Sequence, residues 1–305
     1  MGMIGSSSRK ARPRRRRTLT VFDAANAAFM VLVCIGTLYP FLFVLASSLS
    51  AHNASVGGLS LVPRSFTIAN YARVLADPLV FSGFRNTIAR TALGTALSLT
   101  VVFALAYPLS KKYLPNRGFW TGFVVFTMFF SGGLIPTYLL VRGLGLVDNP
   151  LALVLPELVS AYNMVIARNY MQTIPDSLEE SAKIDGANDI TILFRIILPI
   201  CKPIVATIAL WVAVWHWNAW FDCMIYITRS AGEVLQLVMR RIVIQGSDQL
   251  TEMMGRGMAL QQDQYITPEG LKAATILVTT FPILCAYPFI QKYFVKGVMV
   301  GSLKG

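Results

Sequence analysis

A chain of 305 residues that is 55% hydrophobic and only 14% charged, with a mean hydropathy of +0.58, is too apolar for a soluble domain, in which roughly 25% of residues are charged. The composition therefore predicts an integral membrane protein. The formal net charge of +12 does not indicate nucleic-acid binding, because the basic residues outside the N-terminal tail are scattered among apolar segments. The four cysteines lie in apolar segments without paired spacing, so neither a disulfide framework nor a metal site is expected.

The N-terminal residues 1–17 carry seven Lys and Arg and almost nothing apolar, which is typical of a disordered segment. We therefore expect a basic tail over residues 1–22. The apolar run from 24 to 49 is far longer than the ~7–15 residues of a signal-peptide core, so it is predicted to be the first membrane helix. Together with the loop that follows, it makes up a unit over residues 23–80.

Five further apolar segments each have close to the ~20 residues that cross ~30 Å of hydrocarbon. The segment over residues 119–141 contains two glycines and a proline between Ser131 and Pro136, which predicts a kink or unwound turn at membrane depth. We therefore expect an all-α, polytopic protein with six transmembrane helices. The last five form a core over residues 81–291, and residues 292–305 form a C-terminal tail. The five segments are 81–109, 119–141, 150–167, 200–227 and 271–290.

The distribution of basic residues predicts how these spans are oriented. Six spans place both termini on one side of the membrane. Of the 27 Lys and Arg residues, 17 lie in the two terminal tails, in the 110–117 turn and in the 168–202 segment. The positive-inside rule therefore predicts that both termini are cytoplasmic and that the loop over 228–270 is extracytoplasmic. This loop holds an amphipathic piece around 235–244.

A polar segment over residues 175–199 separates the fourth and fifth predicted spans. Ser177 with Glu180 three residues later fits a capping box at the start of a short helix, and Asp176 offers a second cap. Gly186 supplies the left-handed residue that ends this helix.

A second short helix is predicted to follow, capped by Asn188 or Asp189. It must stop near Pro199, because proline has no N–H to continue the ladder. The 175–199 segment is therefore expected to be a compact helix–turn–helix that protrudes between two membrane spans. Such an element is typical of docking and not of catalysis.

Motifs of catalysis and cofactor binding are missing from this sequence. It has no glycine-rich phosphate loop of the GxxxxGK[ST] type, and its two histidines form no metal-binding pattern. The chain is therefore not expected to be an enzyme, to hydrolyse ATP or to hold a cofactor. If it transports a substrate, the energy must come from another chain or from an ion gradient.

The 175–199 segment also carries a recognisable motif. Residues 180–187 read Glu-Ser-Ala-Lys-Ile-Asp-Gly-Ala, and residues 194–199 read Phe-Arg-Ile-Ile-Leu-Pro. This pattern resembles the EAA motif, EAA-x-x-DGA followed by I-x-LP, of the permease subunits of ATP-binding-cassette (ABC) importers. Ser181 stands where the motif usually has alanine, which replaces one small residue by another.

Three other segments, at 128–139, 215–218 and 287–299, resemble the MalG-like carbohydrate-uptake permeases. The likeness is to the oligosaccharide subgroup, which includes the second permease of the alginate-oligosaccharide importer. It implies a MetI-like permease fold in the inner membrane of a bacterium. It also implies four kinds of partner besides membrane lipid: a second, non-identical permease, two ATPase subunits, an extracytoplasmic substrate-binding protein and an oligosaccharide substrate, with no nucleic acid.

The resemblance further implies that the 175–199 segment is a cytoplasmic coupling helix that docks in a cleft of the ATPase. The residue types agree, because the small side chains allow close approach and Glu180 and Asp185 can pair with basic groups. Taken alone, the capping pattern favours an ordinary cytoplasmic loop helix without a partner, because capping boxes are common. The expected docking residues are Glu180, Ser181, Ala182, Asp185, Gly186, Ala187 and Pro199.

A second candidate region is the aromatic stretch 211–222, which holds four of the five tryptophans. Its rings could line a path and stack on sugars, or form an interfacial aromatic belt and pack between helices. Ionisable residues in spans are costly unless paired or wet, so they mark either a path or interhelical pairing. The 228–270 loop could contact the binding protein or be a surface connector. Candidate path residues are Glu157, Asn163, Trp215, His216, Asn218 and Asp222.

The expected substrate is an oligosaccharide, with an acidic one such as an alginate oligomer preferred. This preference rests on the subgroup resemblance and on arginines near the outer side, which could equally contact lipid. An ion-coupled secondary transporter is the main alternative, but such a protein would show internal symmetry and paired broken helices. A membrane scaffold without transport is the third possibility. The arginines are Arg64, Arg73, Arg85 and Arg90.

Overall fold

The computed structural model describes residues 20–51, 61–63, 65–244 and 269–285. Within these ranges the regular structure is helical, apart from an isolated bridge between Ser50 and Phe66. The all-α prediction is therefore confirmed for the described part of the chain. The predicted tails lie almost wholly outside the described residues, as do positions 245–268 of the predicted outer loop.

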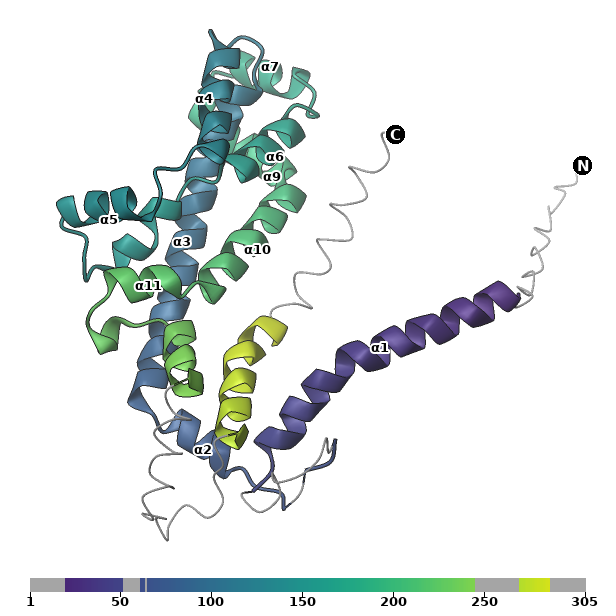
Figure 1. The fold of residues 1–305 in the computed structure, drawn as a ribbon. Helices are drawn as coiled ribbons and strands as arrows, with labels where there is room; N and C mark the ends of the chain where they lie inside the picture. Colours follow the sequence, from purple (N-terminus) through teal and green to yellow (C-terminus); the bar gives the residue numbers. More distant parts are fainter. Residues whose placement is uncertain (1–19, 52–60, 64, 245–268, 286–305) are drawn as a thin grey trace, which may run out of the picture.

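The long helix α3 (Pro78–Ser110) runs through the body and packs against α6 (Ala161–Met171) and α10 (Lys202–Asn218) (Figure 1). Asp77 caps its start by accepting a hydrogen bond from the Leu79 N–H at 2.8 Å, and Pro78 occupies the first turn, where no N–H is needed. Helix α3 therefore positions both α6 and α10.

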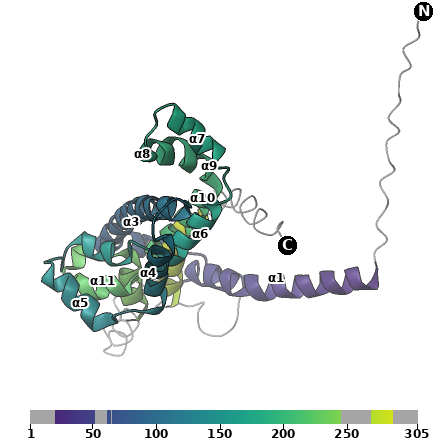
Figure 2. The ribbon, with the colours of Figure 1, turned by 90° about the horizontal axis from the view of Figure 1, so that it is seen from above.

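The first predicted span is found as helix α1 (Val21–Ser48), which leaves the body at an angle and buries little of its surface (Figures 1 and 2). Thr20 and Asp23 form a capping box at its start. At its other end, the Asn70 side chain on α2 (Ala69–Leu75) donates to the Ser48 carbonyl at 3.0 Å. Polar contacts at its last turn therefore attach α1 to the body.

The predicted break at membrane depth is present. Helix α4 (Arg117–Phe129) and helix α5 (Leu134–Gly143) are bent by 111° across it. Gly133 at the bend has φ +84°, a conformation that favours glycine because it has no Cβ. The Gly133 N–H donates to the Ser131 hydroxyl oxygen at 3.2 Å, and the Gly133 carbonyl accepts from the Thr137 hydroxyl at 2.8 Å, so polar backbone groups at the bend are bonded locally.

The fourth and fifth predicted spans need correction, because neither is one continuous helix. The fourth begins as two short 3₁₀ turns, η2 (Pro150–Leu153) and η3 (Leu155–Glu157), and bends by 54° into α6. Pro156 lies inside the predicted span and has no N–H to donate, so it interrupts a regular α-helical ladder there. The fifth is divided by a break at Ala219–Trp220 into α10 and α11 (Phe221–Tyr226).

By length and apolar composition, the described residues contain two unbroken helices that could cross a membrane and three bent pairs that could each be one span. The sixth predicted span is helical over residues 269–285, and its last residues lie outside the described part. The amphipathic piece is helical over 235–244 and packs on the first half of α3. A short 3₁₀ turn, η5 (Ser230–Gly232), precedes it.

The 175–199 segment forms the predicted helix–turn–helix. Its first helix is α7 (Ser177–Ile184). Its second begins as α8 (Asp189–Ile192), continues as the π-helical segment η4 (Leu193–Ile197) and ends in α9 (Leu198–Ile200). The second helix thus runs one residue past Pro199, and the chain then turns by 87° into α10.

Candidate functional site

The helix–turn–helix of α7 and α8 projects from the helical body, which Figure 2 shows most clearly. Gly186, with φ +81°, ends α7. The Ala187 N–H donates to the Ala182 carbonyl at 2.9 Å, and the Gly186 N–H to the Lys183 carbonyl at 3.0 Å. This pair of bonds is a Schellman motif, which satisfies the last carbonyls of α7 and fixes the angle at which the chain leaves it.

The predicted capping box at the start of α7 is wrong. Asp176 occupies the N-cap position in a helical backbone conformation and makes no capping bond with its side chain. Ser177 is already inside the first turn, and its carbonyl accepts from the Ser181 hydroxyl at 2.9 Å. At the second helix, Asn188 is the cap, because its side-chain oxygen accepts from the Thr191 N–H at 2.8 Å.

Most of the predicted docking residues are exposed. The exceptions are Ala182, which is 8% exposed and packs in the chain's own core, and Ala187, which is partly buried and packs against that core. Two apolar side chains that the sequence reasoning missed, Ile184 and Ile190, are 87% and 71% exposed. Their apolar type in an otherwise polar segment was the signal that could have found them. Of the seven predicted docking residues, those that are exposed or half-buried are Glu180, Ser181, Asp185, Gly186, Ala187 and Pro199.

The inner side of α7 carries a buried ionic contact that the sequence reasoning also missed. The Glu179 carboxylate pairs with the Lys111 ammonium and accepts a hydrogen bond from the Tyr107 hydroxyl at 3.2 Å. All three residues are buried, at 5% to 6% exposure. Tyr107 and Lys111 stand at the last turn of α3, so this contact joins the helix–turn–helix to α3.

A second ion pair lies on the exposed side of the same unit. The Lys183 ammonium is 3.3 Å from the Asp189 carboxylate and 4.7 Å from the centre of the Tyr113 ring. The hydrogen bond to Asp189 raises the pKa of Lys183 above its ordinary value, because it stabilises the charged ammonium. Since both side chains face solvent, this pair holds the turn only weakly.

A buried polar cluster also lies in the first half of α3. The Arg90 guanidinium pairs with the Asp222 carboxylate on α11 and donates to the Ala219 carbonyl at 3.3 Å. Its Nε donates to His216 Nδ1 at 3.4 Å. Arg90 therefore satisfies a carbonyl left free by the break between α10 and α11 and connects both helices to α3.

His216 is held on its other side by Gly94. A Cβ at position 94 would lie 2.2 Å from His216 Nε2, so only glycine leaves room for the ring. His216 is 1% exposed and Asn163 7%, and the Asp222 carboxylate is committed to Arg90. In this chain, therefore, His216 and Asn163 are buried and Asp222 is paired, while their assignment to the path stays a prediction.

The remaining path candidates, Glu157, Trp215 and Asn218, are exposed. Trp215 is 42% exposed, and the Arg90 guanidinium carbon lies 5.6 Å from its ring centre. Asn218 uses its amide to donate to the Val214 carbonyl at 2.8 Å. Of the outer arginines, Arg73 and Arg85 are exposed and Arg64 lies outside the described residues.

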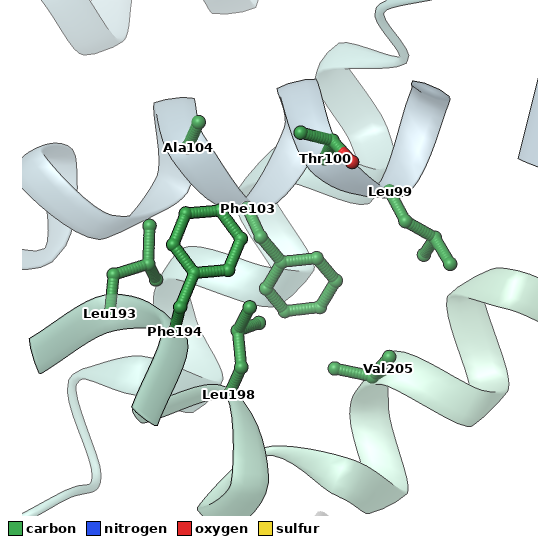
Figure 3. Close-up of a pocket in the computed structure, with 8 residues that line it drawn as sticks. All are labelled: Leu99, Thr100, Phe103, Ala104, Leu193, Phe194, Leu198 and Val205. Atoms are coloured by element: carbon green, nitrogen blue, oxygen red, sulfur yellow. The ribbon is translucent and has the colours of Figure 1, made fainter. Parts of the chain in front are cut away.

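The structure also contains a small cavity of about 100 Å³ between α3, the η4 segment and α10 (Figure 3). It is smaller than the ~300–1,000 Å³ of typical ligand sites. Its lining is apolar except for one hydroxyl, so it offers little to a sugar. The lining residues are Leu99, Thr100, Phe103, Ala104, Leu193, Phe194, Leu198 and Val205.

Comparison with known proteins places these observations in a family. The family described as "Binding-protein-dependent transport system inner membrane component" matches residues 116–300. Protein LplC of Bacillus subtilis is 40% identical over 93% of this chain and 95% of its own. The polygalacturonan/rhamnogalacturonan transport system permease protein YtcP of the same organism is 38% identical over 93% and 99%.

A solved structure agrees in fold. It is a chain from the crystal structure of a bacterial ABC transporter involved in the import of the acidic polysaccharide alginate. The two chains superpose with a TM-score of 0.83 at 31% identity, over 93% of this chain and 100% of the other.

Proposed function

The chain belongs to the family of binding-protein-dependent transport system inner membrane components. From this premise we propose that it forms the membrane path of an importer for acidic oligosaccharides and is driven through its 175–199 segment. It is a MalG-like permease component of an ABC sugar importer, with the all-helical MetI-like fold. It is not an enzyme, since ATP hydrolysis in this family is carried out by separate ATPase subunits.

The observation that carries the coupling proposal is the projecting α7–α8 unit. Its outer side combines two carboxylates, Glu180 and Asp185, with the exposed apolar side chains of Ile184 and Ile190. Acidic groups around apolar anchors suit a cleft that is apolar at its centre and basic at its rim. Gly186 leaves open space above the backbone, which a partner's surface can approach closely. An ATPase subunit docked here would push on α7 as it closes.

The complete assembly follows from the same reasoning. We expect six spans in the bacterial inner membrane, both termini and the α7–α8 unit on the cytoplasmic side, and a second, non-identical permease with two ATPases. The extracytoplasmic binding protein would contact the loop over 228–270.

The preference for an acidic substrate rests on the names of two similar proteins. One relative is named for polygalacturonan and rhamnogalacturonan transport, and one solved neighbour imports alginate. The exposed Trp215 ring supplies an aromatic face on which a sugar ring can stack. Glu157 and Asn218 complete the exposed candidates, with Asn218 already bonded to the backbone.

The coupling proposal is tested by copurification of the ATPase with tagged permease complex. Gly186→Trp and Glu180→Lys should each abolish copurification while the membrane-inserted chain still folds. Gly145→Trp is the matched control, since Gly145 also has a positive φ, of +69°, and open space around it but lies on another loop. Normal ATPase binding by both docking variants would contradict the proposal.

The substrate proposal is tested with the reconstituted complex. Binding proteins loaded with trigalacturonate, an alginate trimer or maltotriose are added, and ATP hydrolysis is measured. The acidic sugars should stimulate hydrolysis and maltotriose should not. Stimulation by maltotriose alone would overturn the acidic preference and leave the coupling proposal intact.

A further inference from the structure

The two adjacent glutamates at the start of α7 face opposite ways. Glu180 is exposed, while Glu179 is 5% exposed and uses both carboxylate oxygens inside the chain. One oxygen pairs with Lys111 and the other accepts from the Tyr107 hydroxyl at 3.2 Å. The Lys111 ammonium also lies 5.0 Å from the centre of the Tyr107 ring. Both carboxylate oxygens of Glu179 therefore have partners inside the chain, and Glu179 is not part of the docking surface.

Stability alone does not account for this arrangement. A buried ion pair gains little over well-packed apolar side chains, because removing both charges from water offsets most of their attraction. What a buried pair provides is a directional contact, which holds two elements in one relative position. Here the two elements are α7, outside the predicted spans, and the last turn of α3, inside the body.

The last turn of α3 is the part of the body that a displacement of α7 would reach first. Lys111 is the C-cap of α3, where a cation is favoured by the helix dipole. On the neighbouring side, Arg168 of α6 donates to the Leu109 carbonyl at 2.9 Å. A displacement of α7 transmitted through Glu179 therefore reaches the point where α3 and α6 are hydrogen-bonded, and α3 packs against α10 beyond it.

We propose that Glu179 is a positioning residue that links the ATPase-docking unit to α3 through Lys111 and Tyr107, so that ATPase docking and closure move α3 together with α7. This inference rests on the proposed coupling function of the 175–199 segment. Glu179 contacts neither the ATPase nor the sugar. It acts by making the α7–α8 unit and the last turn of α3 move as one body.

Hydrogen exchange of the reconstituted permease pair in nanodiscs, with and without its ATPase subunits, tests the link. In the wild type, ATPase addition should slow exchange in peptides covering 177–186 and also in those covering 105–116. In Glu179→Gln, the first response should persist and the second should disappear. Without ATPase, 177–186 should exchange at least about tenfold faster than in the wild type, because a buried charge has lost its partner.

Two further variants separate linkage from simple destabilisation. The double variant Lys111→Met with Glu179→Gln leaves no unpaired buried charge, so it should fold and still lose the 105–116 response. The exchanged pair Lys111→Glu with Glu179→Lys should restore that response. Asp148→Asn, a carboxylate-to-amide change in a distant loop, should behave like the wild type.

The outcomes are distinct. A 105–116 response of wild-type size in either Glu179→Gln or the double variant would overturn the link while leaving ATPase docking established by the 177–186 response. No ATPase effect on 177–186 in the wild type would instead overturn the coupling function, and the inference with it.

Discussion

Helix α3 carries two buried basic residues, and a comparison of their surroundings shows how one helix can serve two purposes. Arg90 and Lys111 are separated by about 31 Å along the axis, at about 1.5 Å per residue. Each pairs with a carboxylate from a distant part of the chain, Asp222 for Arg90 and Glu179 for Lys111. The Arg90 cluster joins segments inside the body, whereas the Lys111 contact joins the body to a projecting unit.

The number of contacts around each basic residue indicates how rigidly it holds its neighbouring helices. Arg90 contacts a carboxylate, a histidine, a carbonyl and an aromatic ring, so the break between α10 and α11 is held from several directions. Lys111 holds α7 through one carboxylate, supported by one hydroxyl. In a membrane, where lipid competes equally for apolar surfaces, such polar contacts set the relative position of helices. We expect the Arg90 cluster to resist change and the Lys111 contact to transmit it.

The largest effect is expected from Asp222→Ala, because it leaves the Arg90 guanidinium buried without its counter-ion. The free energy of unfolding should fall by about 3–5 kcal/mol, measured by thermal unfolding of the purified complex. Arg90→Met combined with Asp222→Leu should recover most of this loss. Wild-type stability of the single variant would show that Arg90 does not depend on Asp222.

A smaller loss is expected when the packing on the far side of the same cluster is altered. Gly94→Ala places a methyl group against the His216 ring, which Arg90 prevents from withdrawing. The cost should be about 1–3 kcal/mol of unfolding free energy. Gly122→Ala, where no neighbouring atom lies within 4 Å, is the control and should not lower stability. Equal unfolding temperatures for both variants would contradict the role of Gly94.

In the α7–α8 unit, which Lys111 contacts, a substitution at the turn after α7 should have a local effect on stability. Gly186→Ala forces a side chain into the left-handed conformation at a cost of about 1–2 kcal/mol. We expect faster amide exchange in 177–187, weaker ATPase copurification and an unchanged unfolding temperature for the body. A global loss of stability would contradict this expectation and show that the Gly186 turn contributes to the stability of the whole body.

The smallest effect is expected from the exposed pair of Lys183 and Asp189. Lys183→Met or Asp189→Asn should change stability by no more than about 0.5 kcal/mol. Because the pKa of Lys183 is raised, the contribution of the pair is complete below the ordinary lysine value of 10.5 and is lost as pH rises through the raised value. Unfolding temperature measured from pH 6 to 9 should therefore show no change due to this pair.

The sequence predicted those features that depend on local residue types. Apolar length located the first and second helices to within a few residues, and the glycines before Pro136 located the bend between α4 and α5. Gly186 and Asn188 were identified because their conformational preferences act over one turn. The predicted box at Ser177 failed because the helix begins one residue earlier than that pattern requires, at Ser177 itself.

The ionic contacts could not be predicted, because their partners are 68 residues apart for Lys111 and Glu179 and 132 for Arg90 and Asp222. The local sequence pattern does not indicate which basic residue pairs with which acidic residue. His216 and Asp222 were recognised as unusual polar residues, but only the packing of α10 on Gly94 shows that the histidine faces inward. Side-chain direction is thus a property of helix packing.

The η4 segment, Leu193–Ile197, has one further consequence, which concerns helical phase. In it, the Leu198 N–H donates to the Leu193 carbonyl five residues earlier, so the turn contains one residue more than an α-helical turn. Deleting a single residue here would regularise the ladder and rotate everything before it by about 100° about the helix axis. The α7 helix would then present another face to its partner although its own sequence is unchanged. The orientation of the docking surface is therefore encoded in chain length as well as in side chains.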